Sequence, residues 1–180
     1  MEFKQTTLTP SPGLAVAIGY YMSALDEVRE QLCDTISGLS PEQLARRVLP
    51  GAHSIGALSL HVGEAEWWWM QCNIAGHKLT LGDRRQPFWD VLVDQDKFAR
   101  KGYSASFCLE VLAGIRRQTR ELLASCADSD LERIYSFTRR QKTTAFSLRW
   151  ALHHLADHEA QHKGQILMLK RLLDEATTAN

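Results

Sequence analysis

Four histidines stand close together near the C-terminal end, in the segment HHLADHEAQHKGQI at residues 153–166. Two of them, His158 and His162, are four residues apart, a spacing that places both rings one turn apart on one face of an α-helix. Two imidazoles in this arrangement can hold a single metal ion. His162 falls within the apolar stripe of the segment and His158 on its shoulder, whereas His154 lies nearer the polar edge. An imidazole on an apolar stripe needs a polar partner, which the rest of the chain must supply.

A third ligand candidate is His61, in a segment whose apolar helical face is formed by Leu58, Val62, Ala65 and Trp69. One histidine from this helix and two from the C-terminal helix can meet inside a helix bundle, where metal sites are built from facing helices. Three protein ligands leave a coordination position open for water or substrate, as in reactive rather than structural sites. For each histidine taken alone, a hydrogen-bonded residue without a metal is the competing interpretation.

The same letters fit the HExxH pattern of zinc proteases, with Glu159 as the residue that activates water. The extended form of that pattern needs glycine at position 165 and histidine at 168, where this chain has Gln165 and Met168. So short a pattern also arises by chance. A protease is therefore the less favoured interpretation.

The composition indicates one globular domain. Of 180 residues, 44% are hydrophobic and 23% charged, which is enough apolar material for a core. Lys+Arg and Asp+Glu both number 21, without the basic excess typical of nucleic-acid binding. No apolar run approaches the ~18 residues of a membrane span, and the four scattered cysteines suit a reduced compartment. We expect a single cytoplasmic domain over residues 1–180, with 1–13 and 174–180 as loose termini and neither nucleic acid nor membrane as a partner.

Apolar residues recur every three or four positions in four long segments, which predicts four amphipathic helices. These segments are 14–36, 55–75, 106–126 and 148–173, with Gly38 as a stop and Ser54 and Ser147 as N-caps. A short helix is expected at Ser40–Gln43. The fold class is therefore all-α, a four-helix bundle with long connections between helices 2 and 3 and between helices 3 and 4.

The two connections carry weaker signals. In the first, residues 77–103, a short helix is expected at Asp90 to Ala99. In the second, residues 134–137 and 143–146 are candidates for a small β-hairpin. Between them stand Arg139, Arg140 and Lys142, which we interpret as part of a solvated loop.

Three segments resemble the DinB/YfiT-like (damage-inducible) superfamily: LSPEQL at 39–44, PGAHSIG at 50–56 leading to His61, and HLADHEAQHKGQI at 154–166. The resemblance runs from about residue 39 to 173 and is weakest across 77–140; HEAQHKGQI is its most specific part. It implies a four-helix bundle, often dimeric, that holds one divalent metal ion by three histidines. The matching positions are His61, His158 and His162, the same three that the helical faces indicate.

The resemblance also implies an activity: metal-dependent transfer of low-molecular-weight thiols or, in some members, hydrolysis of small molecules. A metal held by three neutral imidazoles keeps its full charge and acidifies a bound thiol or water. Three imidazoles suit Zn, Ni, Fe(II) or Cu. The competing hypothesis is a metal-binding or stress-response module without turnover, or a bundle without metal.

Three further residues near the histidines are candidates for supporting roles. Glu159, near the apolar stripe, is a candidate to orient a ligand or act as a base. Glu64 stands one turn from His61, where a solvated helix face is the favoured interpretation. Gln165 stands one turn beyond His162, either in a pocket wall or on the helix surface.

The run Trp67-Trp68-Trp69 raises the question of a partner chain. Consecutive helical residues diverge by ~100°, so at least one of these rings is expected to point away from the core of its own bundle. We therefore predict a homodimer, with one tryptophan at its interface and the others in the core or a pocket wall. Gly164, in the middle of a helix, either lets another helix approach closely or is merely tolerated.

Overall fold

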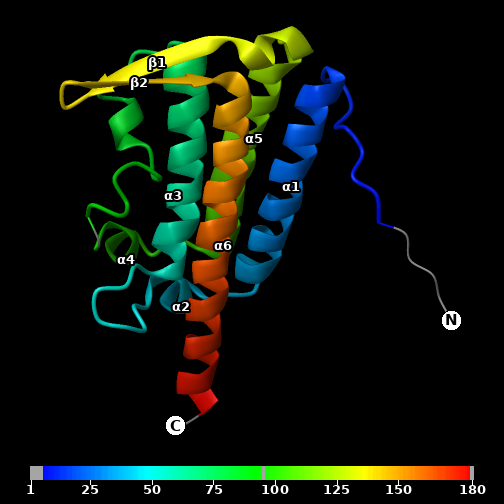
Figure 1. Ribbon diagram of the computed structural model, residues 1–180. Helices are drawn as coiled ribbons and strands as arrows, with labels where there is room; N and C mark the ends of the chain where they lie inside the picture. The colour runs from blue at the N-terminus through cyan, green and yellow to red at the C-terminus, as the bar shows by residue number, and fades with distance from the viewer. Residues whose placement is uncertain (1–5, 95, 179–180) are drawn as a thin grey trace, which may run out of the picture.

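The computed structural model describes residues 6–94 and 96–178, and it is mainly helical (Figure 1). In chain order the elements are α1 (Val16–Ser37), α2 (Pro41–Ala45), α3 (Ile55–Trp67), the π-helix η1 (Trp68–Ile74), the 3₁₀ turn η2 (Asp83–Arg85), α4 (Lys97–Lys101), α5 (Ala105–Ala124), the 3₁₀ turn η3 (Asp128–Glu132), the strands β1 (Ile134–Arg139) and β2 (Lys142–Ser147), and α6 (Leu148–Thr178). The all-α class is correct apart from the small sheet, and the four long helices lie where the apolar periodicity predicted them.

The four long helices pack side by side through their apolar faces. Helix α1 contacts α5 and α6, and α3 contacts the same two helices. The core residues that they bury completely include Ile18, Met22, Leu25, Leu32, Ile36, Leu60, Leu112, Leu123, Leu152 and Ile166. Each such side chain contributes about 1.5–3 kcal/mol when it leaves water. This packing fixes the rotation of α3 and α6, and therefore which of their polar residues face each other.

Serine side chains begin the helices that carry the histidines. The hydroxyl of Ser54 accepts a hydrogen bond from the backbone N–H of Ala57 at the start of α3, at 3.2 Å. Ser147 accepts one from Trp150 at the start of α6, at 3.1 Å. Both caps were predicted. An N-cap of this kind contributes about 1 kcal/mol.

Gly63 lets α5 approach α3 closely. A Cβ at this position would lie 2.9 Å from side-chain atoms of both Leu112 and Ile115. Because Gly63 is only two residues from His61, this close contact also holds that histidine at a fixed depth. At Gly164 the situation differs: a Cβ there would meet nothing within 4 Å. The close helix approach suggested for Gly164 was wrong, and the glycine is simply tolerated.

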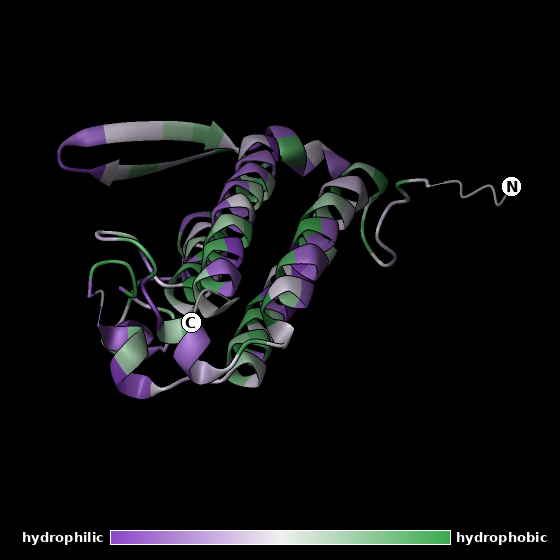
Figure 2. Ribbon diagram, turned by 90° about the horizontal axis from the view of Figure 1, so that it is seen from below, coloured by the Kyte–Doolittle hydropathy of each residue, from purple (hydrophilic) through white to green (hydrophobic). Residues whose placement is uncertain are grey.

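The two long connections lie on the same side of the helices (Figures 1 and 2). The predicted β-hairpin is present: β1 and β2 are antiparallel, with Ile134 opposite Ser147 and Arg139 opposite Lys142. In the first connection the short helix is α4, at 97–101 rather than 90–99. Residues 90–94 form turns instead, and Asp90 has a left-handed φ of 55°, which a helix does not accommodate.

All three tryptophans of the run 67–69 are covered by their own chain. Trp67 and Trp69 are each 8% exposed, and Trp68 is half-buried. Trp67 lies against Phe88 in the first connection, with ring centroids 6.0 Å apart, whereas Trp68 and Trp69 both pack on Phe137 of the hairpin. None of the three rings is left fully exposed, because the connections cover the faces that the helices leave open. The homodimer stays a prediction without this support.

The ends of the chain are more ordered than expected. Helix α6 continues through residues 174–178, which had been predicted as part of a loose tail. Near the start, the backbone N–H of Ser11 donates to the carbonyl of Gly19 at 3.0 Å, and Ser11 is buried. Residues 1–5 and 179–180 lie outside the described part of the chain.

Candidate metal centre

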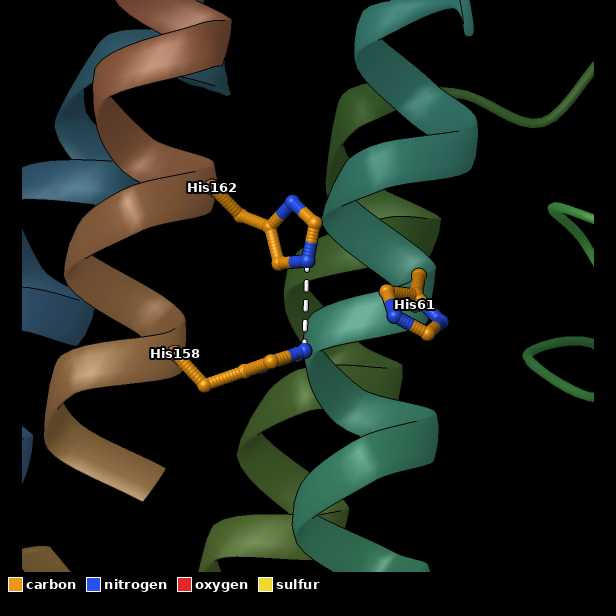
Figure 3. Close-up of side chains that lie close together, drawn as sticks. All are labelled: His61, His158 and His162. Carbon is orange, nitrogen blue, oxygen red and sulfur yellow. Dashed lines mark hydrogen bonds between the residues drawn. The ribbon is translucent and has the colours of Figure 1, made fainter. Parts of the chain in front are cut away.

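Three imidazoles meet between α3 and α6 (Figure 3). His61 reaches across from α3, and His158 and His162 come from successive turns of α6. The ring centroids are 5.3 Å apart for His61 and His158, 5.1 Å for His61 and His162, and 4.5 Å for His158 and His162. One nitrogen from each ring lies within 4.8 Å of the others, and all three residues are half-buried. The structure thus brings together the three residues that the sequence indicated.

The spacing of the two α6 nitrogens fits a small divalent ion. The Nε2 atoms of His158 and His162 are 3.2 Å apart. Two ligands of a tetrahedral ion at metal–nitrogen distances of 2.0–2.1 Å are separated by about 3.3 Å. Nitrogen donors also belong to the ligand class that zinc, nickel and ferrous iron prefer.

Two neighbouring side chains fix the tautomer of their histidines. The Nδ1 atom of His61 lies 3.1 Å from a carboxylate oxygen of Glu64, and Nδ1 of His162 lies 2.8 Å from the amide oxygen of Gln165. Both partners accept hydrogen bonds, so each Nδ1 carries the proton and each Nε2 keeps its lone pair. Ligand histidines in metalloproteins usually have such a partner on the second nitrogen. The sequence favoured a solvated helix face for Glu64, but its carboxylate bonds His61 instead. The amide of Gln165 is directed at His162.

Burial favours the neutral form of the two imidazoles on α6. Burial, together with the neighbouring rings of His162, His61 and His154, lowers the pKa of His158 to about 3. Burial also lowers the pKa of His162, although its bond to Gln165 acts in the opposite direction. Because metals bind the neutral form of histidine, the site is prepared for an ion at neutral pH without first losing protons.

Glu159 does not face the imidazoles. It is 2% exposed and belongs to a group of four buried charges, one from each long helix, which we call the ion cluster: Arg29 of α1, Glu66 of α3, Arg116 of α5 and Glu159 of α6. One oxygen of Glu159 accepts from Nε of Arg29, and the other accepts from both arginines at 3.1 Å. With both oxygens engaged, Glu159 is not free to activate water, which counts against the HExxH protease interpretation.

Glu66 completes the ion cluster. Its oxygens accept hydrogen bonds from Arg29 at 2.8 Å and from Arg116 at 2.9 and 3.1 Å. Burial alone opposes ionisation of this carboxyl, but the two guanidinium groups outweigh it and lower the pKa of Glu66 to about 2. No pattern in the sequence indicates this cluster, since Arg29, Glu66 and Arg116 stand far apart in the chain.

A cavity of about 570 Å³ opens beside the histidines. His61, Glu64, His158 and His154 line one part of it, and the aromatic rings of Trp68, Trp69, Trp89 and Phe137 line much of the rest. His154 is stacked on Trp150 at a ring-centroid distance of 4.7 Å, so it belongs to the cavity wall rather than to the helix edge where the sequence placed it. The volume lies within the 300–1,000 Å³ usual for small-molecule sites. The three histidines therefore form a candidate metal centre beside a substrate-sized, mostly apolar space.

Comparisons with known proteins agree with this site. A family model described as mycothiol-S-transferase matches residues 21–175, a range that contains all three histidines. Among proteins of curated function, no relative matches the chain. In the part of the chain that the structure describes, no helix is both long and apolar enough to cross a membrane. Because the match covers most of the chain, this protein belongs to the mycothiol-S-transferase family and, through it, to the DinB/YfiT-like superfamily.

Proposed function

We propose that this protein is a metal-dependent S-transferase that joins a low-molecular-weight thiol, of the mycothiol type, to an electrophilic small molecule. The observation that carries the proposal is the convergence of three imidazoles beside an aromatic cavity, in a chain of this family. We propose His61, His158 and His162 as the ligands of one divalent ion, with zinc, nickel or iron as the candidates.

The chain's own residues have distinct tasks in this reaction. His61, His158 and His162 would hold the ion, while Glu64 and Gln165 keep the first and third rings in position. The bound ion would supply a Lewis acid that lowers the pKa of a thiol or water beside it. Trp68, Trp89 and Phe137 offer flat apolar surfaces that hold the electrophile and displace water from its reacting carbon. Glu159 is assigned a structural role, through its bonds to Arg29 and Arg116.

The overall transfer is balanced without a further reactant. The thiol loses its proton to solvent, and its sulfur forms a bond to the electrophilic carbon. With a halide leaving group, the carbon–halogen bond breaks and the halide departs with the electron pair. The products are a thioether, a halide ion and a proton.

The experiment is a transferase assay on protein purified without a polyhistidine tag. Bound metal is measured first, and monochlorobimane is then offered with mycothiol, glutathione or cysteine. We expect a rate above the uncatalysed one with mycothiol, lost on chelation and restored by the ion found in the protein. The His162→Ala variant should stay inactive after metal addition. Bound metal without acceleration by any thiol would instead support hydrolysis or the module without turnover.

Two further features belong to the same proposal. We infer a four-helix bundle of DinB type from the packing of α1, α3, α5 and α6, with the long connections after η1 and α5. The homodimer is retained on the family resemblance alone. Sedimentation at micromolar concentration tests it, since a dimer has twice the 20.4 kDa mass of the chain.

A further inference from the structure

The tip of the β-hairpin carries three cationic residues beside the aromatic cavity. Arg139 ends β1, Lys142 begins β2, and Arg140 lies in the turn between them. Figure 2 shows this hydrophilic tip extending from the helices on the side of the first connection. Arg139 also lines the aromatic cavity that His61 and His158 line. A segment that the sequence suggested was only solvated loop is therefore part of the wall around the proposed reaction site.

A second cavity adjoins the first at this tip. Its volume is about 440 Å³, and Phe137, Arg139, Arg140, Lys142 and Thr144 line it. Phe137 and Arg139 belong to both cavities. The first space thus offers aromatic walls and a metal centre, and the second offers three cations and no carboxylate.

The side chains of these three cations have no ion-pair partner among the residues that the structure describes. No ion pair or side-chain hydrogen bond joins Arg139, Arg140 or Lys142 to another residue in the described ranges. Two carboxylates, those of Glu64 and Asp90, line the first cavity together with Arg139. The carboxylate of Glu64 already accepts hydrogen bonds from His61 and from the backbone N–H of Asp90. Three adjacent positive charges without counter-charges repel each other unless an anion lies between them.

The backbone conformation of the hairpin turn is a second, independent observation about its residues, because they are not the ones that would stabilise the turn most. Arg140 and Gln141 both have left-handed backbones, with φ of 49° and 62°. A turn of this kind favours Asn-Gly, and side chains larger than these cost about 1 kcal/mol or more in the left-handed region. An arginine at position 140 therefore destabilises the turn. The same residue places a cation at the second cavity.

We propose that the hairpin tip binds the anionic group of the electrophilic substrate, with Arg139 as its main contact. The substrate class is a planar conjugated acid: its apolar part lies against Trp68, Trp89 and Phe137, and its carboxylate reaches Arg139, Arg140 and Lys142. This inference rests on the proposed function for the role of the bound molecule, but not for its binding. In the transfer to a halogenated acid of this class, the thiol loses its proton to solvent and its sulfur bonds to the ring carbon that bears the halogen. The carbon–halogen bond breaks, and the halide departs with the electron pair.

The test compares the binding of 2-naphthoate with that of its neutral counterpart, 2-naphthamide, by quenching of tryptophan fluorescence. Both probes are measured with zinc-loaded and chelator-treated protein. Because exposed ion pairs are modest, we expect naphthoate to bind about fivefold more tightly than naphthamide, with a preference that fades at high salt. Arg139→Gln should remove most of this preference and leave naphthamide binding unchanged. The matched control is Arg133→Gln, since Arg133 lies over Tyr135 at the other end of β1 and lines neither cavity.

Two outcomes would overturn the inference. One is an undiminished naphthoate preference in Arg139→Gln, and the other is a preference that disappears on chelation of wild-type protein, which would show that the metal holds the carboxylate. Activity adds a separate readout: Arg139→Gln should raise KM for 4-chloro-3-nitrobenzoate and leave KM for the neutral 1-chloro-2,4-dinitrobenzene unchanged. Absence of any transferase activity would defeat the proposed function while the binding comparison still decides the role of the tip.

Discussion

Two polar clusters lie between α3 and α6, and they use their polar groups in opposite ways. In the ion cluster, each carboxylate oxygen of Glu66 and Glu159 accepts from an arginine, and all four side chains are at most 8% exposed. In the metal centre, His61, His158 and His162 direct their nitrogens at one another, and Nε2 of His61 has no protein donor in the described ranges. Yet the clusters are neighbours in sequence, since His158 and Glu159 are adjacent.

The two clusters differ in whether their polar groups already have hydrogen-bond partners, and this difference distinguishes a structural polar cluster from a functional one. A satisfied buried cluster ties helices together, and removing one member leaves an uncompensated charge. A cluster of unprotonated nitrogens beside an open cavity is unfavourable for folding and useful only when a ligand completes it. Substitutions in the two clusters should therefore have opposite effects on stability and on metal binding.

The His162→Ala substitution should abolish stoichiometric metal binding, because it leaves two protein ligands. The metal-free variant should unfold within about 1 kcal/mol of metal-free wild type, since among the described residues the half-buried side chain of His162 bonds only to Gln165 and His158 of its own helix. Elemental analysis and denaturant unfolding measure the two quantities. Full metal occupancy in this variant would show that the three imidazoles are not one site.

The Glu159→Gln substitution should lower stability and leave metal binding intact, the opposite of His162→Ala. It leaves Arg29 and Arg116 with one negative partner fewer, so the free energy of unfolding should fall by about 3 kcal/mol while metal content stays at the wild-type level. Urea unfolding of chelator-treated protein gives the first value. As a control, Arg149→Gln breaks the exposed pair with Glu132 and should change stability by less than about 1 kcal/mol. Metal loss in a folded Glu159→Gln protein would return this carboxylate to the metal centre.

Acid should weaken the ion cluster in a defined range. The pKa of Glu66 in the folded protein is about 2, below the 4.5 of an unperturbed glutamate. Its contribution to stability is therefore complete above pH 4.5 and is lost as the pH falls toward 2. Between pH 4.5 and 3, the stability advantage of wild type over Glu66→Gln should shrink by about 2 kcal/mol, measured by urea unfolding of chelator-treated protein. A constant advantage across this range would mean that Glu66 is not a paired carboxylate.

The smallest effect is expected from the side chains that orient the ligands. Gln165→Ala and Glu64→Gln should each weaken metal binding by about 10-fold to 100-fold and leave its stoichiometry at one ion. Competition with a chromogenic chelator measures the affinity. Gln161→Ala is the matched control, because Gln161 bonds Asp157 on the exposed side of the same helix. Equal affinities for Gln165→Ala and Gln161→Ala would remove Gln165 from the site.

The positions of the long helices, and the choice of His61, His158 and His162 as candidate ligands, could be predicted from the sequence alone. Apolar periodicity locates a helix because the burial of one face dominates its stability, and the four-residue spacing of His158 and His162 needs only the helix geometry to bring the rings together. The apolar face of residues 55–75 also indicated His61 as the third candidate ligand. The resemblance to a known superfamily led to the same three positions, and the family match agrees with it.

Only the tertiary structure decided which partner each remaining polar residue meets. Residues 158 and 159 are separated by ~100° around the helix and both lie near its apolar stripe, so periodicity does not tell which of them faces α3's histidine and which faces the arginines. That depends on the rotation of α6 against α1, α3 and α5, which the whole core sets at once. The same holds for the burial of Trp67–Trp69 and the position of Arg139: both depend on where irregular connections lie, and irregular backbone has no period from which its contacts can be read.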